Sequence, residues 1–287
     1  MKKLPIGIQD IGKIRTQGYV YVDKTQFALA LIEGHAPHYF LSRPRRFGKS
    51  LFVSTLAAIF KGHKELFEGC HIAQSSYDWL PHPILHLNLA EVLNTTTEKL
   101  EASLQRSVMD LATEHEVKIE IPSAQEGLNN LIKALASRGQ VVVLIDEYDK
   151  PIIDHIHNGE VAEGNRRLLQ SFFGVLKHLD KHIKFTFITG ISRFSKVSLF
   201  SDANHLKDIS MDGRYAAMMG YTQEEIAQDF AEHLAAIAQE QSKTEKEVLE
   251  VLKTWYNGYR FTKAATYVYN PFSALNYLDE REPKSYW

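Results

Sequence analysis

The stretch His38-Tyr39-Phe40-Leu41-Ser42-Arg43-Pro44-Arg45-Arg46-Phe47-Gly48-Lys49-Ser50 carries the strongest structural signal in this chain. A short apolar run leads into a basic loop, the loop ends in Gly-Lys-Ser, and an amphipathic helical pattern follows at once. This order of strand, tight loop and helix is typical of a loop that cradles phosphate groups. The sequence therefore predicts a phosphate-binding loop that runs from residue 43 into the following helix.

Three residues at the end of the loop have specific uses in phosphate binding. Gly48 lets the backbone approach phosphate oxygens, Lys49 supplies a positive charge for the outer phosphates, and the Ser50 hydroxyl can ligate Mg²⁺. The general pattern has a glycine six positions before the lysine, where this chain has Arg43. Gly-Lys-Ser alone is weak evidence, so the prediction depends on its context. The candidate nucleotide-binding residues are Arg43, Pro44, Arg45, Arg46, Phe47, Gly48, Lys49, Ser50 and Leu51.

A second motif supports the first. Residues 140–147 form a run of β-branched and other apolar residues that ends in Asp146 and Glu147. A strand that is apolar at every position fits a parallel sheet buried on both faces, and ligands of such sheets bind at the carboxyl ends of the strands. Asp146 can hold Mg²⁺ through water, and Glu147 can deprotonate a water that attacks the γ-phosphate. The alternative is a buried strand followed by a solvated acidic turn, in which Asp149 and Lys150 would be turn residues or supporting neighbours.

The chain alternates between strand patterns and helix patterns. Such alternation predicts an α/β fold of the P-loop NTPase type, with a five-stranded, mostly parallel sheet covered by helices on both faces. The predicted strands are residues 38–42, 84–90, 140–146, 184–190 and 208–211. The predicted helices between them are residues 49–61, 97–116, 124–138 and 160–179.

After about Gly220 the pattern changes to helices alone. Thr222 with Glu225, and Thr244 with Glu247, form capping boxes, and Asn270-Pro271 begins a third helix. We therefore predict an N-terminal segment (1–35) that packs on a core (36–219), followed by a small helical lid (220–287). The alternative for the last unit is a plain packing extension. The aromatic end of the chain suggests that a longer polypeptide continues beyond Trp287.

Composition excludes several classes of protein. The chain has 287 residues and a net charge of −2, so its overall charge gives no attraction to nucleic acid or to a membrane. We expect no membrane span, because no apolar run is long enough to cross a bilayer, and no signal peptide, because no apolar region follows the charged start. The single cysteine, Cys70, excludes an intrachain disulfide and fits a reducing compartment, so we expect a cytoplasmic protein.

Other candidate residues have weaker support. Thr189 ends a predicted strand, where its hydroxyl could touch the γ-phosphate or the attacking water, or could bond to the backbone instead. Arg193 follows on the next turn and could stabilise transition-state charge, within its own subunit or across to a neighbour in a homo-oligomer, or could pair with a surface acid such as Asp202 or Asp208. Arg45 and Arg46 could contact phosphates or an exposed nucleic acid. His155 and His157 fit a solvated turn better than a metal site.

Five groups of motifs together resemble a known family. They are residues 19–25, 43–51, 144–149, 189–193, and 255–261 with 269–273. Together they look like the bacterial AAA-ATPase-like family, whose members often carry a C-terminal PD-(D/E)XK nuclease-like domain. Arg43 is similar to the residue in that family's own loop. The resemblance implies a P-loop ATPase core, and it places any nuclease-like domain beyond Trp287.

Three functions follow as hypotheses. The favoured one is an ATP-driven switch that uses Mg-ATP, with Glu147, Thr189 and Arg193 as catalytic residues and with Ser50 and Asp146 as metal ligands. The second is a scaffold that binds nucleotide without turnover. The third is an ATPase part that gates a fused nuclease, with nucleic acid as a partner of the missing domain. No guanine-reading Asn-Lys-x-Asp motif is present, which favours ATP over GTP.

Overall fold

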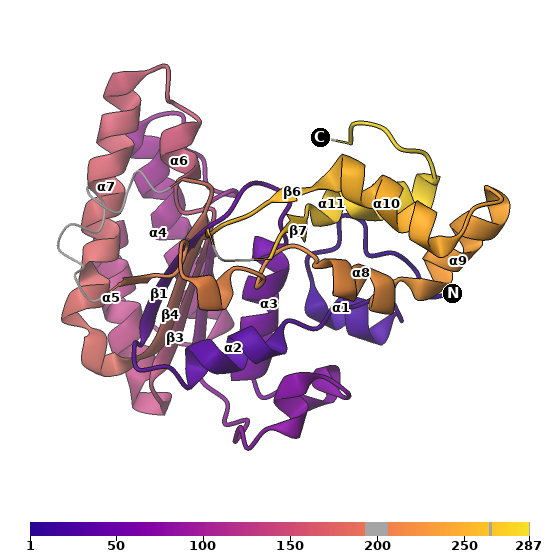
Figure 1. Cartoon of the computed structure of the whole chain (residues 1–287). Helices are drawn as coiled ribbons and strands as arrows, with labels where there is room; N and C mark the ends of the chain where they lie inside the picture. Colours follow the sequence, from indigo (N-terminus) through magenta and orange to yellow (C-terminus); the bar gives the residue numbers. More distant parts are fainter. Residues whose placement is uncertain (193–205, 264–265, 287) are drawn as a thin grey trace.

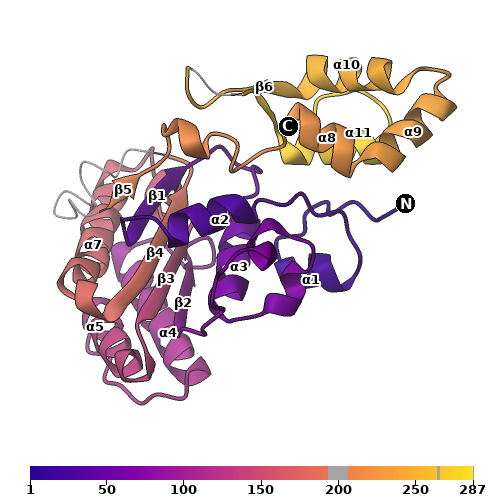
Figure 2. The ribbon, with the colours of Figure 1, turned by 60° about the horizontal axis from the view of Figure 1, so that its bottom comes forward.

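A computed structural model of the chain describes residues 1–192, 206–263 and 266–286. Five parallel strands form its central sheet, and helices lie on both faces of the sheet (Figures 1 and 2). The strands are β1 (His38–Ser42), β2 (Ile84–Asn88), β3 (Val141–Asp146), β4 (Ile183–Gly190) and β5 (Lys207–Asp208). Their order in the sheet is β2-β3-β4-β1-β5, and every neighbouring pair is parallel. The predicted fold class is therefore confirmed.

Two strands end earlier than predicted, for the same reason. β2 ends at Asn88 rather than at residue 90, because the Asn88 side chain accepts a hydrogen bond from the Ala90 N–H at 3.1 Å. β5 ends at Asp208 because the Asp208 carboxylate accepts a hydrogen bond from the Ser210 N–H at 2.8 Å. Asn and Asp side chains that bond to the backbone two residues on start turns, so both side chains stop their strands.

Three long helices cover one face of the sheet and α3 covers the other (Figure 2). α4 (Thr97–Glu114), α5 (Ala124–Leu135) and α7 (Gly159–His178) lie on the first face, and each begins at a side chain that accepts a backbone hydrogen bond. α3 (Lys49–Phe60) lies on the second face beside α1 (Ile11–Thr16) and α2 (Thr25–Ile32). The shorter helices are η1 (Lys64–Phe67), η2 (His71–Gln74), η3 (Ala136–Arg138), α6 (Lys150–Ile153), η4 (Asp180–His182) and η6 (Gly213–Tyr215).

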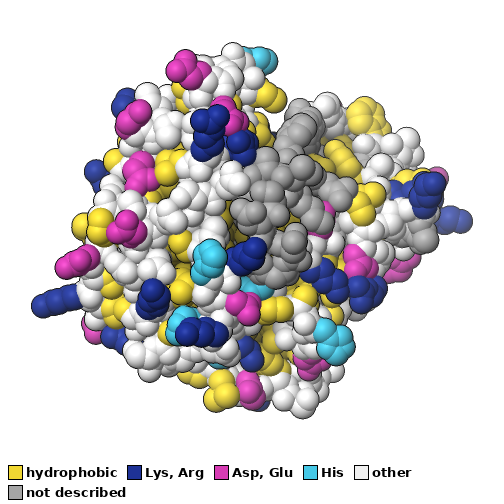
Figure 3. Space-filling model, turned by 90° about the vertical axis from the view of Figure 1, so that its left-hand side faces the viewer, with side chains coloured by type: hydrophobic (Ala, Val, Ile, Leu, Met, Phe, Trp, Pro, Cys, Tyr) yellow, Lys and Arg dark blue, Asp and Glu magenta, His cyan; other side chains and the backbone are white. Residues whose placement is uncertain are grey.

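The sheet contributes side chains to two separate apolar cores, because successive residues of a strand point to opposite faces. Val143 and Ile145 belong to the core beneath α4, α5 and α7. Val142 and Leu144 belong to the core beneath α3. Burial on both faces explains why β3 is apolar at every position up to Asp146. On the side of the molecule that carries α5 and α7, basic and acidic side chains are interspersed (Figure 3), in line with the balanced net charge.

The described residues after Gly220 form four helices and a small strand pair. The helices are α8 (Gln223–Asp229), α9 (Ala231–Glu240), α10 (Glu245–Tyr256) and α11 (Pro271–Glu280). Both predicted capping boxes and the predicted Asn270 cap are confirmed. The expectation of helices alone is wrong, because β6 (Asn257–Tyr259) pairs with β7 (Val268–Tyr269) in an antiparallel ribbon. These strands are too short for an alternating pattern to appear in the sequence.

The N-terminal segment packs on both parts of the molecule. Ile11 and Ala28 are buried with α3, whereas Val20 and Val22 are buried with the C-terminal helices. The Lys24 ammonium group donates a hydrogen bond to the Ala217 carbonyl oxygen and forms an ion pair with Glu225 of α8 at 2.6 Å. The first residues of the chain thus connect the sheet with the helices that follow it.

Candidate functional site

The loop between β1 and α3 changes direction through two residues in the left-handed region. Arg46 has a φ of 63° and Gly48 has a φ of 86°. A Cβ atom added at Gly48 would meet no other atom within 4 Å. The glycine is therefore required by its backbone conformation, which side-chain-bearing residues rarely adopt, and the space beside it is open to a ligand. Helix α3 begins at the next residue, Lys49.

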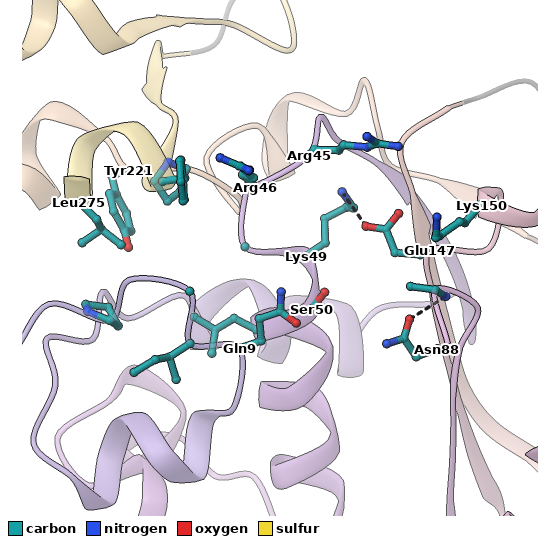
Figure 4. Close-up of a pocket in the computed structure, with 18 residues that line it drawn as sticks. Gln9, Arg45, Arg46, Lys49, Ser50, Asn88, Glu147, Lys150, Tyr221 and Leu275 are labelled. Carbon is teal, nitrogen blue, oxygen red and sulfur yellow. Dashed lines mark hydrogen bonds and ion pairs between the residues drawn. The ribbon is translucent and has the colours of Figure 1, made fainter. Parts of the chain in front are cut away.

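The Lys49 side chain is held inside the loop. It is only 3 % exposed, and its Nζ donates hydrogen bonds to the carbonyl oxygens of Arg43 at 3.2 Å and Pro44 at 3.1 Å. The same Nζ lies 3.5 Å from Oε1 of Glu147 at the end of β3 (Figure 4). The two residues singled out in separate motifs of the sequence therefore meet, although one strand, β4, lies between β1 and β3.

A cavity of about 440 Å³ opens beside this ion pair (Figure 4). Its charged lining consists of four basic side chains and one acidic side chain, which are Arg45, Arg46, Lys49, Lys150 and Glu147. The excess of positive charge favours an anionic ligand. The remaining lining residues are Pro5, Gly7, Ile8, Gln9, Gly48, Ser50, Leu51, Asn88, Ala90, Tyr221, Pro271, Phe272 and Leu275.

The predicted loop residues divide into two sets. Those that line the cavity are Arg45, Arg46, Gly48, Lys49, Ser50 and Leu51, whereas Arg43, Pro44 and Phe47 do not. The Arg43 guanidinium group is buried and donates hydrogen bonds to the carbonyl oxygens of Ser42, Ser210 and Tyr215. Burial lowers the pKa of Arg43 to about 10, and the group remains positively charged at neutral pH. Its side chain therefore holds the loop in place instead of facing a phosphate.

Aromatic rings from the C-terminal part of the chain contact the same loop. The Phe47 ring lies 4.7 Å from the Tyr259 ring and 5.6 Å from the Phe261 ring, edge to face in both pairs. The Arg43 guanidinium group lies 3.9 Å from the centre of the Phe261 ring, and that of Arg46 lies 3.9 Å from the centre of the Phe272 ring. Tyr259, Phe261 and Phe272 thus pack directly against this loop.

The two acids at the end of β3 differ in their surroundings. Asp146 is 1 % exposed, and its Oδ1 accepts a hydrogen bond from the Glu147 N–H at 2.9 Å. Glu147 adopts a φ of 51°, an unfavourable conformation for a residue with a side chain. Burial raises the pKa of Glu147; the charge of Lys49 lowers it, and the charges of Asp146 and Asp149 raise it further. Glu147 therefore holds its proton to a higher pH than an ordinary glutamic acid, which suits a general base.

The end of β4 is hydrogen-bonded to the segment that follows β3. The Thr189 hydroxyl is fully buried and has no hydrogen-bond partner among the described residues, so it is not satisfied by the backbone. Asp149 accepts hydrogen bonds from the Ile191 N–H and from both the N–H and the hydroxyl of Ser192. Asp149 therefore fixes the turn that follows Thr189. Arg193, the other residue predicted on this turn, lies outside the described residues.

Comparison with known proteins assigns the family. Residues 5–200 match the family described as "Predicted AAA-ATPase". The chain belongs to this family. A protein of Azotobacter chroococcum mcd 1, named "Uncharacterized protein in vnfD 5'region", is 42 % identical over 294 residues. That alignment covers all of this chain and 54 % of the relative, so the chain spans about half the length of the curated relative it matches. No solved structure matches.

The family assignment supports nucleotide binding at a coarse level, and the geometry adds residues that the sequence did not indicate. Pro5 and Ile8 of the N-terminal segment line the cavity, and no local pattern marks them. Tyr221 and Leu275 line it from the C-terminal part of the chain (Figure 4), again without a local signal. Asn88 and Lys150 carried a usable signal, because each follows or ends a strand at the carboxyl edge of the sheet, where ligands bind.

A metal ion held by protein side chains alone has no support in the described part of the chain. No group of three or more His, Cys, Asp or Glu side chains there is arranged to hold one. His155 instead contacts the Asn94 side chain at 3.2 Å. The few oxygen donors at the ends of the strands fit Mg²⁺, because this ion takes few protein oxygens together with substrate phosphates and water.

No helix among the described residues is long and apolar enough to cross a membrane.

Proposed function

We propose that this chain binds Mg-ATP in the cavity beside Lys49 and hydrolyses it. The observation that carries the proposal is the meeting of Lys49, at the start of α3, with Glu147, at the end of β3, on one basic cavity. The lysine supplies charge for the phosphates, and the carboxylate is positioned to accept a proton from an attacking water. Membership of the predicted AAA-ATPase family supports the same reading.

The basic end of the cavity is the proposed phosphate site. The backbone N–H groups at the start of α3 and the Lys49 ammonium group provide the first contacts. Arg45 and Arg46 also line the cavity and add positive charge. Phosphate oxygens would compete for the Lys49 ammonium group with its present partners, which are the carbonyl oxygens of Arg43 and Pro44 and the carboxylate of Glu147.

The other end of the cavity is more apolar and suits the base and ribose. Pro5, Ile8, Tyr221 and Leu275 line it, and they come from the N-terminal segment, the start of the C-terminal part and α11. Flat apolar walls with a few polar groups are typical of nucleotide base sites. The sequence lacks the motif that commonly reads guanine, so we assign ATP.

The catalytic assignments follow from the same geometry. Ser50 and Asp146 are the proposed contacts to Mg²⁺, which when bound would neutralise phosphate charge. Glu147 is the proposed general base. Thr189 offers a buried hydroxyl that needs a partner, which a γ-phosphate or the attacking water would provide. Arg193 remains a proposed contact to transition-state charge, acting within one subunit or between subunits.

A second function has support from one observation. The relative from Azotobacter is nearly twice as long as the alignment, so the part of it that matches this chain belongs to a larger protein. We propose as an alternative that nucleotide turnover here gates a further domain, for which a nuclease acting on nucleic acid is the candidate. Turnover that rises on addition of DNA or RNA to a full-length protein would favour it.

The test of the main proposal is a binding and turnover measurement on matched lysine variants. Lys49→Ala should weaken Mg-ATP binding by about 2–4 kcal/mol, because it removes a charge that meets the phosphates directly. Lys61→Ala, at the exposed far end of the same helix, is the control and should bind ATP like the wild type. Unchanged ATP affinity in a folded Lys49→Ala variant would refute the site.

A further inference from the structure

Lys150 is a positively charged residue of the cavity that belongs neither to the loop between β1 and α3 nor to the acidic end of β3. It begins α6, three residues after Glu147, and its side chain lines the cavity. In Figure 4 the Lys49 and Lys150 side chains lie on either side of Glu147. Lys150 therefore approaches the space beside the carboxylate from the end of β3, whereas Lys49 approaches it from the loop after β1.

The Lys150 ammonium group has a weak partner at present. Its Nζ donates hydrogen bonds to Oδ1 and Oδ2 of Asp154 at 2.9 and 2.8 Å. The two side chains are 34 % and 31 % exposed, and exposed ion pairs four residues apart on a helix stabilise only slightly. Burial raises the pKa of Asp154, but hydrogen bonds from Lys150 and Asn94 outweigh it and bring the pKa below its ordinary value. Asp154 is therefore an anion at neutral pH.

Asp154 would remain satisfied if Lys150 left it. The Asn94 side chain donates a hydrogen bond to Oδ2 of Asp154 at 3.0 Å. Asn94 is itself fixed, because Asn165, buried within α7, donates a hydrogen bond to the Asn94 carbonyl oxygen at 3.1 Å. The carboxylate therefore has a rigid second partner, and the long flexible stem of Lys150 is free to reorient toward a stronger anion.

We propose that Lys150 is a second phosphate-binding lysine of this site, which leaves Asp154 to contact the terminal phosphate of the bound nucleotide. The assignment rests on the proposed nucleotide-binding function. The terminal phosphate is the part of ATP that lies farthest along the loop toward Glu147, because Glu147 is the proposed base for attack on it. A ligand without that phosphate would leave Lys150 on Asp154.

The test compares ATP with ADP in variants that separate the phosphate contact from the ion pair. Calorimetric titrations with Mg-ATP and Mg-ADP would use the wild type, Lys150→Ala, Lys150→Met and Asp154→Asn. Lys150→Met keeps most of the aliphatic stem, so it serves if the alanine variant is poorly folded. Asp154→Asn removes the same ion pair but leaves the lysine charge in place, and thermal unfolding of each variant reports the structural cost.

The expected result is a loss that is specific for the terminal phosphate. Both lysine variants should bind ATP about tenfold or more weakly and bind ADP within about twofold of the wild type, whereas Asp154→Asn should bind ATP as tightly as the wild type or more tightly. Equal losses in the Lys150 and Asp154 variants, equal losses for ATP and ADP, or wild-type ATP affinity in the lysine variants would each overturn the role of Lys150 alone. Failure of the wild type to bind ATP would overturn the proposed function and this role with it.

Discussion

Glu147→Gln gives opposite expectations for binding and for chemistry. The substitution keeps the shape of the side chain and removes its charge. Lys49 lies 3.5 Å from the Glu147 carboxylate, which corresponds to a gross Coulomb attraction of about 5 kcal/mol at an effective dielectric constant of about 20. Desolvation offsets most of that attraction. Loss of the pair leaves a buried ammonium group without its anion, and ATP would supply a new one.

We therefore expect Glu147→Gln to bind Mg-ATP more tightly, by about 1–2 kcal/mol, and to be less stable than the wild type without nucleotide by a similar amount. Turnover should fall by about 10²–10⁴-fold, because the amide cannot accept the proton of the attacking water. Burial raises the pKa of Glu147, so wild-type turnover should fall as the pH decreases through that raised value. The variant should lack this acid limb.

Calorimetry and single-turnover phosphate release measure the two effects separately. Glu114→Gln, which removes an exposed carboxylate at the end of α4, is the matched control and should change neither quantity. Equal turnover in the wild type and in Glu147→Gln would refute the catalytic role and favour a scaffold that binds nucleotide without hydrolysis. Weaker binding combined with lower turnover would show instead that the carboxylate contributes to holding the ligand.

Two further substitutions test the neighbouring strand ends. Asp146→Asn should raise the Mg²⁺ concentration needed for tight ATP binding, and a magnesium titration that matches the wild type would contradict its role as a metal ligand. Gly190→Ala should lower the free energy of unfolding by about 1–3 kcal/mol, because the added Cβ would lie 2.4 Å from Oδ1 of Asp149 and 2.5 Å from the buried Tyr148 ring. Gly174→Ala, where a Cβ meets nothing within 4 Å, should instead stabilise the protein in urea unfolding.

Local chemistry explains why the centre of the site is visible in the sequence. The apolar run of β3, the Gly-Lys-Ser start of α3 and the caps at Thr222, Thr244 and Asn270 each depend on residues that are close in the chain. The direction of the Arg43 side chain, in contrast, depends on residues that are distant in the chain. Its guanidinium group bonds to the Ser210 and Tyr215 carbonyl oxygens, more than 160 residues away, so a loop arginine that seems suited to phosphate is buried instead.

The strand order and the walls of the cavity were also beyond the reach of the sequence. Parallel strands are joined by crossover connections, and the sequence of such a connection does not determine which strands become neighbours in the sheet. The placement of β4 between β1 and β3 decides that Lys49 meets Glu147 across one strand. Pro5 and Leu275 come within one cavity only because the two ends of the chain pack together, which no short motif records.

The aromatic contacts on the phosphate loop bear on how this protein can be divided. Cutting the chain at residues 219 and 220 would leave the whole sheet, the loop and both acids on one fragment, but would remove Tyr259, Phe261 and Phe272. Phe47 would then lose the rings that cover it, and two arginines of the loop would lose the surfaces on which they stack. A fragment that contains every proposed catalytic residue would therefore lack the rings that support the loop between β1 and α3.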